Sequence, residues 1–474
     1  MKEGYDNTGV SSLQIESGVF DGVYFHCSIE DHLTKLYNLK PGKVLYTHDL
    51  LHRTGLVDKH LTAQLKFLQE IIPICQQIFT TFNWGADYEK FREATAVWRL
   101  TQRNLVNFSD TRFANSKRKV FKNIHYQFAP IVSCLEEQII AGVRNRSGQE
   151  PSDSKVRDKA DLARELKGKV LNLNFLLTLS GLVDIYDQFG AIVQVTQMVT
   201  LLPHERLDLY TKAVSRLDNM GLAQDHKDCE QFFNGDEKVK CLWPVHHADK
   251  KTYKEKKMIR GMYILDEQGV QAAGLGILTR RQKGENIVMA KENTEKKCDE
   301  KLLKVVKGLS AGLSNDVYSP EGKAVIEETR VILDLPTLAL KLKEPGASVI
   351  KVSLTEFPRF NKAVFKVPVD SIKEIPEQEL KSQYKLFLER LHEMTKDLDK
   401  DILSKTDSKE LIQKFLDPAG ELFKDIEMIM QALVVCSVKH SCESVLESFV
   451  SMYENHFDVR RNTEEDATNE EFEI

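Results

Sequence analysis

A cluster of positive charges is the feature of this sequence whose chemistry is easiest to state. Arg112, Lys117, Arg118, Lys119 and Lys122 surround the predicted start of a helix, whose apolar residues recur at intervals of three and four. Unpaired amides and the macrodipole make a helix N-terminus partly positive, so cations there cost stability unless an anion lies against them. A phosphate group would supply that anion.

The same cluster has a second interpretation. The cations can form a solvated helix face that is paired with nearby carboxylates, as charges on helical proteins often are. The first interpretation predicts contact with nucleic-acid phosphates, and the second predicts ion pairs within the protein. The residues alone leave both open.

Composition limits where a nucleic acid could bind. The chain has 474 residues, of which 42% are hydrophobic and 29% charged, as in folded globular proteins. Its 66 basic and 71 acidic residues give a net charge of −5, so any contact with DNA must be local. No apolar run reaches the ~20 residues of a membrane span, and the N-terminus lacks the apolar core of a signal peptide. We therefore expect an intracellular protein that is not in a membrane.

Apolar periodicity predicts a mostly helical chain. Helices are expected at residues 61–82, with a kink at Pro73, and at 120–139, 169–202, 376–400 and 426–457. Short strands are expected at 18–25, 43–47, 262–265, 271–279, 348–354 and 363–369. The polar stretch from 144 to 160 is typical of a linker.

One motif at the basic cluster resembles a known family. Thr111-Arg112-Phe113 follows an aromatic segment and leads into the long helix. It resembles the Thr-Arg-Trp block of hAT-type transposases, which move DNA segments with an RNase H-like core. Phe113 stands where that family usually has Trp, and the resemblance gives it a structural role.

A second block of that family lies near the N-terminus. Many hAT-type proteins have a catalytic acid in an Asp-Gly pair, followed by Cys-x-x-His and a helix. Asp21-Gly22 matches the pair and His52 matches the histidine, whereas Asp49 stands at the position of the cysteine. The resemblance implies a catalytic role for Asp21 and a structural role for His52. Without it, Asp21-Gly22 is a turn signal and His52 a half-buried histidine.

The resemblance also implies a metal site that is incomplete. Such transposases hold Mg²⁺ ions with three carboxylates. The helix around Glu447 is similar to the family's C-terminal block, although Glu443 one turn earlier also fits a solvated acidic face. Only twenty residues precede Asp21, so we expect the first acid to be missing. Two acids cannot position two ions, and we expect Mg²⁺ only if the core is complete.

Together these observations predict a mainly α protein with a small mixed α/β sheet, namely an incomplete RNase H-like core with a large helical insertion. The expected parts are residues 1–145 of the core, a linker at 146–160, a mostly helical insertion at 161–420 and a C-terminal dimerisation region at 421–474. The expected function is that of a domesticated or truncated transposase, which is nuclear, non-catalytic and DNA-associated, has no assured cofactor and assembles into homo- or hetero-oligomers. The alternatives are a helical protein-protein interaction module without nucleic-acid binding, and a fragment of an active DNA transposase.

Overall fold

The computed structural model describes residues 17–20, 35, 45–108, 113–142, 154–198, 201–222, 241–264, 294–318, 320–357 and 377–416, with a few single positions up to 433. Within these ranges the chain is mainly helical, as predicted, and the strands form two short pairs. The chain divides into two compact units. Unit 1 consists of residues 1–53, 194–211 and 317–474, and unit 2 consists of residues 54–193 and 212–316.

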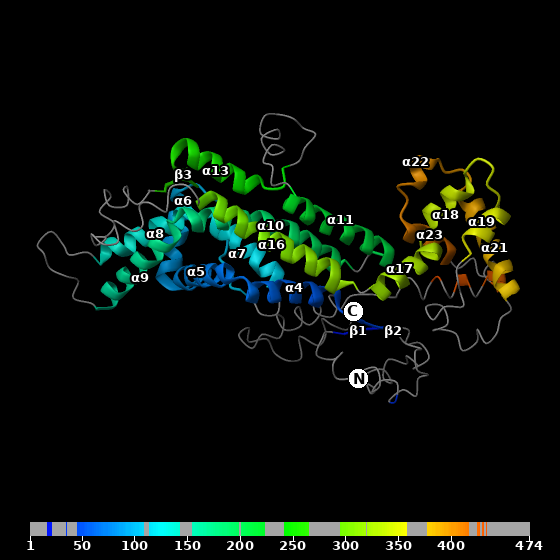
Figure 1. Ribbon diagram of the computed structural model, residues 1–474, viewed down its shortest axis with the longest axis horizontal. Helices are drawn as coiled ribbons and strands as arrows, with labels where there is room; N and C mark the ends of the chain where they lie inside the picture. The colour runs from blue at the N-terminus through cyan, green and yellow to red at the C-terminus, as the bar shows by residue number, and fades with distance from the viewer. Residues whose placement is uncertain are drawn as a thin grey trace, which may run out of the picture. The chain divides into compact units, whose positions relative to one another are not determined.

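Unit 2 is a body of long helices (Figure 1). They are α4 (Leu50–Gln64), α5 (Lys66–Phe82), α6 (Gly85–Val97), α7 (Phe113–Tyr126), α8 (Phe128–Ala141), α9 (Ser154–Val170), α10 (Leu173–Gln197), α11 (Pro203–Leu222), α13 (Pro244–Lys256) and α16 (Thr294–Gly312), of which α4, α10 and α11 extend into unit 1. Helix α8 packs along both α6 and α9. The predicted linker is therefore helical from Ser154 onward, while residues 146–153 lie outside the described ranges.

Helix α10 is the buried helix of unit 2. Its apolar side chains are buried on nearly all sides, at Phe175, Leu176, Leu177, Leu179, Leu182, Val183, Ile185, Tyr186, Phe189, Ile192 and Val193. This confirms a helix within the predicted range 169–202, although α10 is shorter at both ends and Pro203 begins α11. Among the described helices α10 alone is long and apolar enough to cross a membrane, but 83% of its apolar window is buried within the protein, as in a core helix.

Two glycines fix the position of α16 against its neighbours. A Cβ atom at Gly181 of α10 would lie 2.2 Å from Leu302 of α16, and one at Gly308 of α16 would lie 2.3 Å from Leu61 of α4. Each leucine therefore occupies space that only glycine leaves open. The two close crossings lock α16 onto α4 and α10.

Two predicted helices divide at positions that the sequence analysis did not identify. The helix predicted at 61–82 breaks at Leu65, whose backbone is extended, whereas Pro73 lies inside α5. The helix predicted at 120–139 breaks at Gln127, between α7 and α8. The Gln127 side chain accepts from the Arg103 N–H and donates to the Arg103 carbonyl, both at 2.8 Å, so it satisfies backbone groups of segment 101–108, which has no regular secondary structure.

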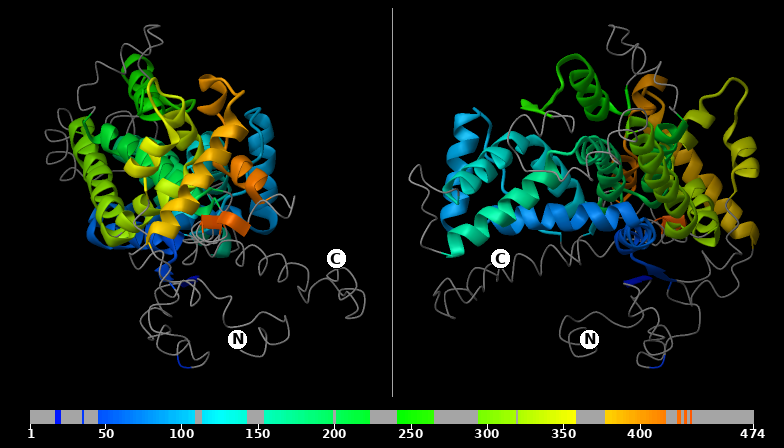
Figure 2. Two further views of the ribbon diagram at one scale, coloured as in Figure 1. Left: turned by 90° about the vertical axis from the view of Figure 1, so that its right-hand side faces the viewer. Right: turned by 60° about the vertical axis from the view of Figure 1, so that its left-hand side comes forward.

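Unit 1 contains a strand pair and the C-terminal helices. Its elements are β1 (Ser17–Phe20), β2 (Leu45–His48), a π-helical turn (Leu313–Val317) at its boundary, α17 (Pro320–Leu333), α18 (Leu335–Leu342), α19 (Val349–Thr355), α21 (Glu377–Thr395), α22 (Lys400–Leu403), α23 (Ser408–Leu416) and a 3-10 turn (Lys424–Ile426). Strands β1 and β2 pair in parallel, with Ser17 opposite Leu45. Helices α18, α19, α21 and α23 lie side by side around a core that includes Leu335, Leu338, Tyr384, Phe387 and Leu411 (Figures 1 and 2).

The strand predicted at 348–354 is wrong, because this segment forms α19. Ser348 caps the helix by accepting a hydrogen bond from the Lys351 N–H at 3.2 Å. In a strand Ile350, Val352 and Leu354 would share one face. In the helix only Val352 is buried, and Ile350 and Leu354 are exposed.

A short hairpin follows α13. Strands β3 (Met258–Ile259) and β4 (Met262–Tyr263) pair antiparallel. Arg260 and Gly261 between them have φ values of 50° and 81°, the positive values that a type I′ turn needs at both central positions. Residues 262–263 lie within the strand predicted at 262–265, and they pair with β3, which the sequence did not predict. Residues 271–279 and 363–369, and 426–457 apart from single positions, lie outside the described ranges.

Candidate functional site

The structure describes only part of the predicted catalytic remnant. Asp21 and Glu447 both lie outside the described residues. His52 is half-buried in the first turn of α4, where its N–H donates to Asp49 Oδ2 at 2.8 Å. Asp49 thus caps α4 from the position at which the family has cysteine. No group of three or more His, Cys, Asp or Glu side chains that could hold a metal ion occurs in the part of the chain that the structure describes.

The predicted basic cluster lies at the start of α7, which begins at Phe113. Arg112 is outside the described residues. Lys117 points into unit 2 and is only 4% exposed. Its Nζ lies 2.8 Å from Asp58 Oδ2 and donates to Thr62 Oγ1 at 2.5 Å, both on α4. A phosphate cannot reach this ammonium, so the position of Lys117 does not fit its predicted contact with DNA.

Asp58 connects three helices through this contact. It is fully buried, and its Oδ1 accepts a hydrogen bond from the Tyr186 hydroxyl of α10 at 2.6 Å. Burial, and then the negative charge of Asp58, raise the pKa of Tyr186, so the phenol keeps the proton that it donates. Asp58 of α4 therefore links Lys117 of α7 and Tyr186 of α10 through one buried carboxylate.

Two further cations of α7, Arg118 and Lys122, share one carboxylate. Arg118 Nε lies 2.8 Å from Asp187 Oδ1 of α10, and Lys122 Nζ lies 3.1 Å from Asp187 Oδ2. The Arg118 stem packs over Gly190, where a Cβ atom would lie 2.5 Å from Arg118 Cδ. These side chains remain about one-third to one-half exposed, and Lys119 is exposed.

The internal ion pairs match the second interpretation of the cluster. Sequence analysis missed both acids, Asp58 and Asp187, because they reach α7 from other helices. One signal was present: Asp58 lies on the same helix face as Val57 and Leu61, and a lone acid on an apolar face needs a buried partner.

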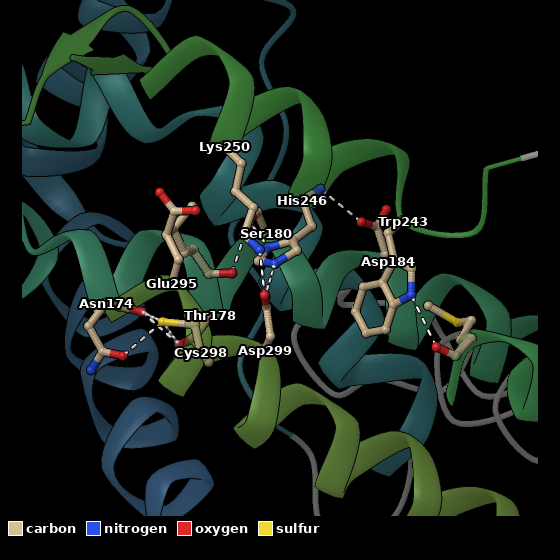
Figure 3. A network of polar contacts seen from close by, with 12 residues as sticks. Asn174, Thr178, Ser180, Asp184, Trp243, His246, Lys250, Glu295, Cys298 and Asp299 are labelled. Carbon is tan, nitrogen blue, oxygen red and sulfur yellow. Dashed lines mark hydrogen bonds and ion pairs between the residues drawn. The ribbon is translucent and has the colours of Figure 1, made fainter. Parts of the chain in front are cut away.

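A second polar cluster joins α10, α13 and α16 (Figure 3). His246 of α13 lies between Ser180 of α10, at 3.1 Å from Nδ1, and Asp299 of α16, at 2.9 Å from Nε2. Lys250, one turn further along α13, donates to both oxygens of Asp299 at 2.6 and 2.7 Å. Burial lowers the pKa of His246. Burial opposes ionisation of Asp299 as well, but hydrogen bonds from His246 and Lys250 outweigh it and hold the pKa of Asp299 at about 2.

Serine, histidine and aspartate in a row are also the groups of a nucleophilic triad. Ser180, however, is completely buried in the middle of α10, and its Oγ also contacts the Leu177 carbonyl at 3.0 Å. A substrate cannot reach this hydroxyl. The cluster acts as a structural connection.

Further polar contacts hold the start of α13. The carboxylate of Asp184 on α10 accepts from the backbone N–H groups of Val245 and His246 at 3.1 and 2.8 Å, which caps α13 from another helix. Burial raises the pKa of Asp184 to about 8, although these two hydrogen bonds oppose the shift. The Trp243 indole donates to the Met220 carbonyl at 3.2 Å.

The other side of α13 rests on a second histidine. Asp249 Oδ2 lies 2.6 Å from His125 Nε2 of α7, and Arg260 of the hairpin lies 2.9 Å from His125 Nδ1. Burial lowers the pKa of His125. The buried residues of α13 are His246, Asp249 and Lys250, so polar contacts rather than apolar side chains attach this helix.

No family model, curated protein or solved structure gives a significant match to this chain.

Proposed function

We propose that the chain is a transposase-derived, non-catalytic protein that associates with the phosphate backbone of DNA in the nucleus. The observation that carries this proposal is a local surplus of positive charge. Arg118 and Lys122 face the single carboxylate of Asp187, and Lys119 is exposed beside them. The surplus lies on the second and third turns of α7, where the exposed cations can meet a further anion.

Binding of this kind follows from counterion release. Each cation that neutralises a phosphate contributes about 0.9 to the slope of log affinity against log salt. Arg118, Lys119 and Lys122 would together contribute roughly 2.7 to that slope. Phosphate contacts position a protein on DNA without reading its sequence, so we expect little sequence preference.

Fluorescence titration of a labelled duplex at several salt concentrations tests the proposal. Replacing Arg118, Lys119 and Lys122 by Gln should flatten the salt slope by roughly two to three units and weaken binding to all sequences alike. A parent chain that does not bind duplex even at the lowest salt concentration would refute DNA association.

The non-catalytic part of the proposal has its own test. Supercoiled DNA incubated with the chain and Mg²⁺ or Mn²⁺ should not be nicked. The matched control is the double variant Asp21→Asn, Glu447→Gln. Nicking by the parent that disappears in this variant would indicate a complete metal site and favour the fragment of an active transposase.

Exposed apolar side chains favour a second candidate function, that of a helical interaction module. Trp84 and Val97, at the two ends of α6, are 76% and 80% exposed, and Ile140 near the end of α8 is 70% exposed. Helices α6 and α8 pack together. Sedimentation over a range of concentrations tests this candidate, because Trp84→Ser and Ile140→Ser should shift the chain towards monomer if these side chains form an oligomer interface.

A further inference from the structure

A second row of cations lies on α13 and the hairpin that follows it. All five of its side chains are exposed, namely Lys251, Lys254, Lys256, Lys257 and Arg260. Glu255 is the single acid between Lys251 and Arg260. We call these five residues the α13 cation row.

The inward face of α13 explains why the row faces outward. His246 and Lys250 point from α13 toward Asp299 of α16 (Figure 3), and Asp249 contacts His125. These contacts orient α13 so that its remaining lysines are exposed, with Lys254 at the edge of the inward face, in contact with Glu295 of α16. The carboxylates of Asp249 and Asp299 are thus occupied by His125, His246 and Lys250.

The backbone that carries the end of the row is held in place by contacts within the protein. Lys257 adopts a left-handed conformation with φ 54° and ends α13 by donating its N–H to the Tyr253 carbonyl at 2.8 Å. The type I′ turn then holds Arg260 against His125, and a Cβ atom at Gly261 would lie 3.0 Å from the Trp98 ring. A preordered surface loses less conformational entropy when it binds.

Helix stability alone does not account for so many cations. Lysines in the last turn of a helix offset a macrodipole of about half a charge, which one side chain suffices to balance. Lys254 also contacts Glu295 of α16 at 3.1 Å, but its side chain is 64% exposed, and exposed pairs of this kind contribute little. Arg260 also contacts His125, and Lys257 Nζ lies 4.7 Å from the centre of the Tyr253 ring. All five side chains nevertheless remain exposed, so a phosphate group can reach their charges.

We infer that the α13 cation row binds the phosphate backbone of duplex nucleic acid. This inference rests on the proposed function and assigns it a principal surface. Lys251 and Lys257 are separated by about 9 Å at a helical rise of about 1.5 Å per residue. A duplex presents one negative charge per ~1.7 Å of its axis, or about five over that length. Four of the five cations are lysines, which act as flexible point charges and suit contact without sequence readout.

The test compares two variants with the same change in net charge. The first replaces Lys251, Lys254, Lys256 and Lys257 by Gln. The control replaces four exposed lysines of unit 1, Lys381, Lys385, Lys396 and Lys414, by Gln. In fluorescence titrations with a labelled duplex, the first variant should flatten the salt slope by roughly three to four units, whereas the control should keep the slope of the parent.

Two further arms keep the outcome decisive. A variant with Arg at the four α13 positions keeps the charge and should keep the slope, which separates charge from any effect on folding. Poly-glutamate of similar charge should compete with the duplex only weakly. The α13 assignment is overturned if the parent binds duplex but the α13 Gln variant matches the control. It is also overturned if poly-glutamate competes as well as duplex DNA. Neither outcome decides whether the chain binds DNA through another surface. A parent that does not bind duplex refutes the proposed function itself.

Discussion

The start of α7 and the end of α13 carry similar clusters of cations, but the structure uses them differently. In α7, Lys117 is buried against Asp58, and Arg118 and Lys122 share Asp187. In α13, one lysine, Lys250, is drawn inward by Asp299, and the others remain exposed. Density of charge in the sequence does not distinguish the two clusters, and each receives two carboxylates from neighbouring helices. Exposure distinguishes them, because Arg118 and Lys122 are 35% and 44% exposed in their pairs with Asp187, whereas Lys254 is 64% exposed in its pair with Glu295.

The largest expected effect separates the buried part of the α7 cluster from its exposed part. Asp58→Ala leaves the Lys117 ammonium without its counter-charge and the Tyr186 hydroxyl without its acceptor, which should lower the free energy of unfolding by about 3–5 kcal/mol. Asp187→Ala removes a partner that is about one-third exposed and should cost at most about 1 kcal/mol. Urea unfolding of both variants measures the difference, and equal losses would show that Lys117 is not the structural cation.

A smaller loss of stability should follow from a substitution that displaces α16, the helix that carries Asp299. Gly181→Ala places a Cβ atom 2.2 Å from Leu302, and such overpacking should cost about 1–3 kcal/mol. Gly168→Ala in α9 is the matched control, because no atom lies within 4 Å of its added Cβ, and alanine in a helix should stabilise by up to about 1 kcal/mol. Thermal unfolding should therefore shift in opposite directions, and two stabilising substitutions would contradict the close crossing.

The smallest effect concerns pH. Burial lowers the pKa of His246, so the unfolded chain binds a proton more readily than the folded chain. Stability from this group is complete above its ordinary pKa of about 6.5 and is lost as the pH falls through the folded pKa. His246→Gln should weaken the loss of stability between pH 6.5 and 5 by at most about 1.4 kcal/mol per pH unit. Unfolding curves at both pH values measure this, and identical pH dependence in parent and variant would show that His246 does not titrate in this range.

The raised pKa of Asp184 makes the opposite prediction. This carboxyl has a pKa of about 8 in the folded chain, so its contribution to stability is lost as the pH rises from its ordinary pKa towards 8. Asp184→Asn should therefore make stability less dependent on pH between 6.5 and 8. Unchanged dependence in this variant would assign the titration to another group.

The sequence predicted elements better than it predicted their partners. Long apolar periodicity predicted α10, and short apolar runs, the second of them after the turn signal Lys40-Pro41-Gly42, predicted β1 and β2. Local signals were also available where predictions were wrong, since the Ser348 cap marks α19 despite its β-branched residues. By contrast, the pairing of Lys117 with Asp58 depends on how α7 packs against α4, which no spacing within α7 encodes. The exposed lysines from Lys251 to Lys257 were visible in the sequence, but their exposure follows from contacts with α7, α10 and α16.

The central claim is that Lys117 serves the fold whereas the lysines of the α13 cation row meet phosphate. Lysine acetylation followed by mass spectrometry, with and without duplex DNA, tests both halves in one measurement. Lys117 should react slowly under both conditions, and Lys251, Lys254, Lys256 and Lys257 should react rapidly in the free chain and become protected by duplex. The account is contradicted if Lys117 reacts rapidly in the free chain and is protected by duplex while the four α13 lysines react alike under both conditions.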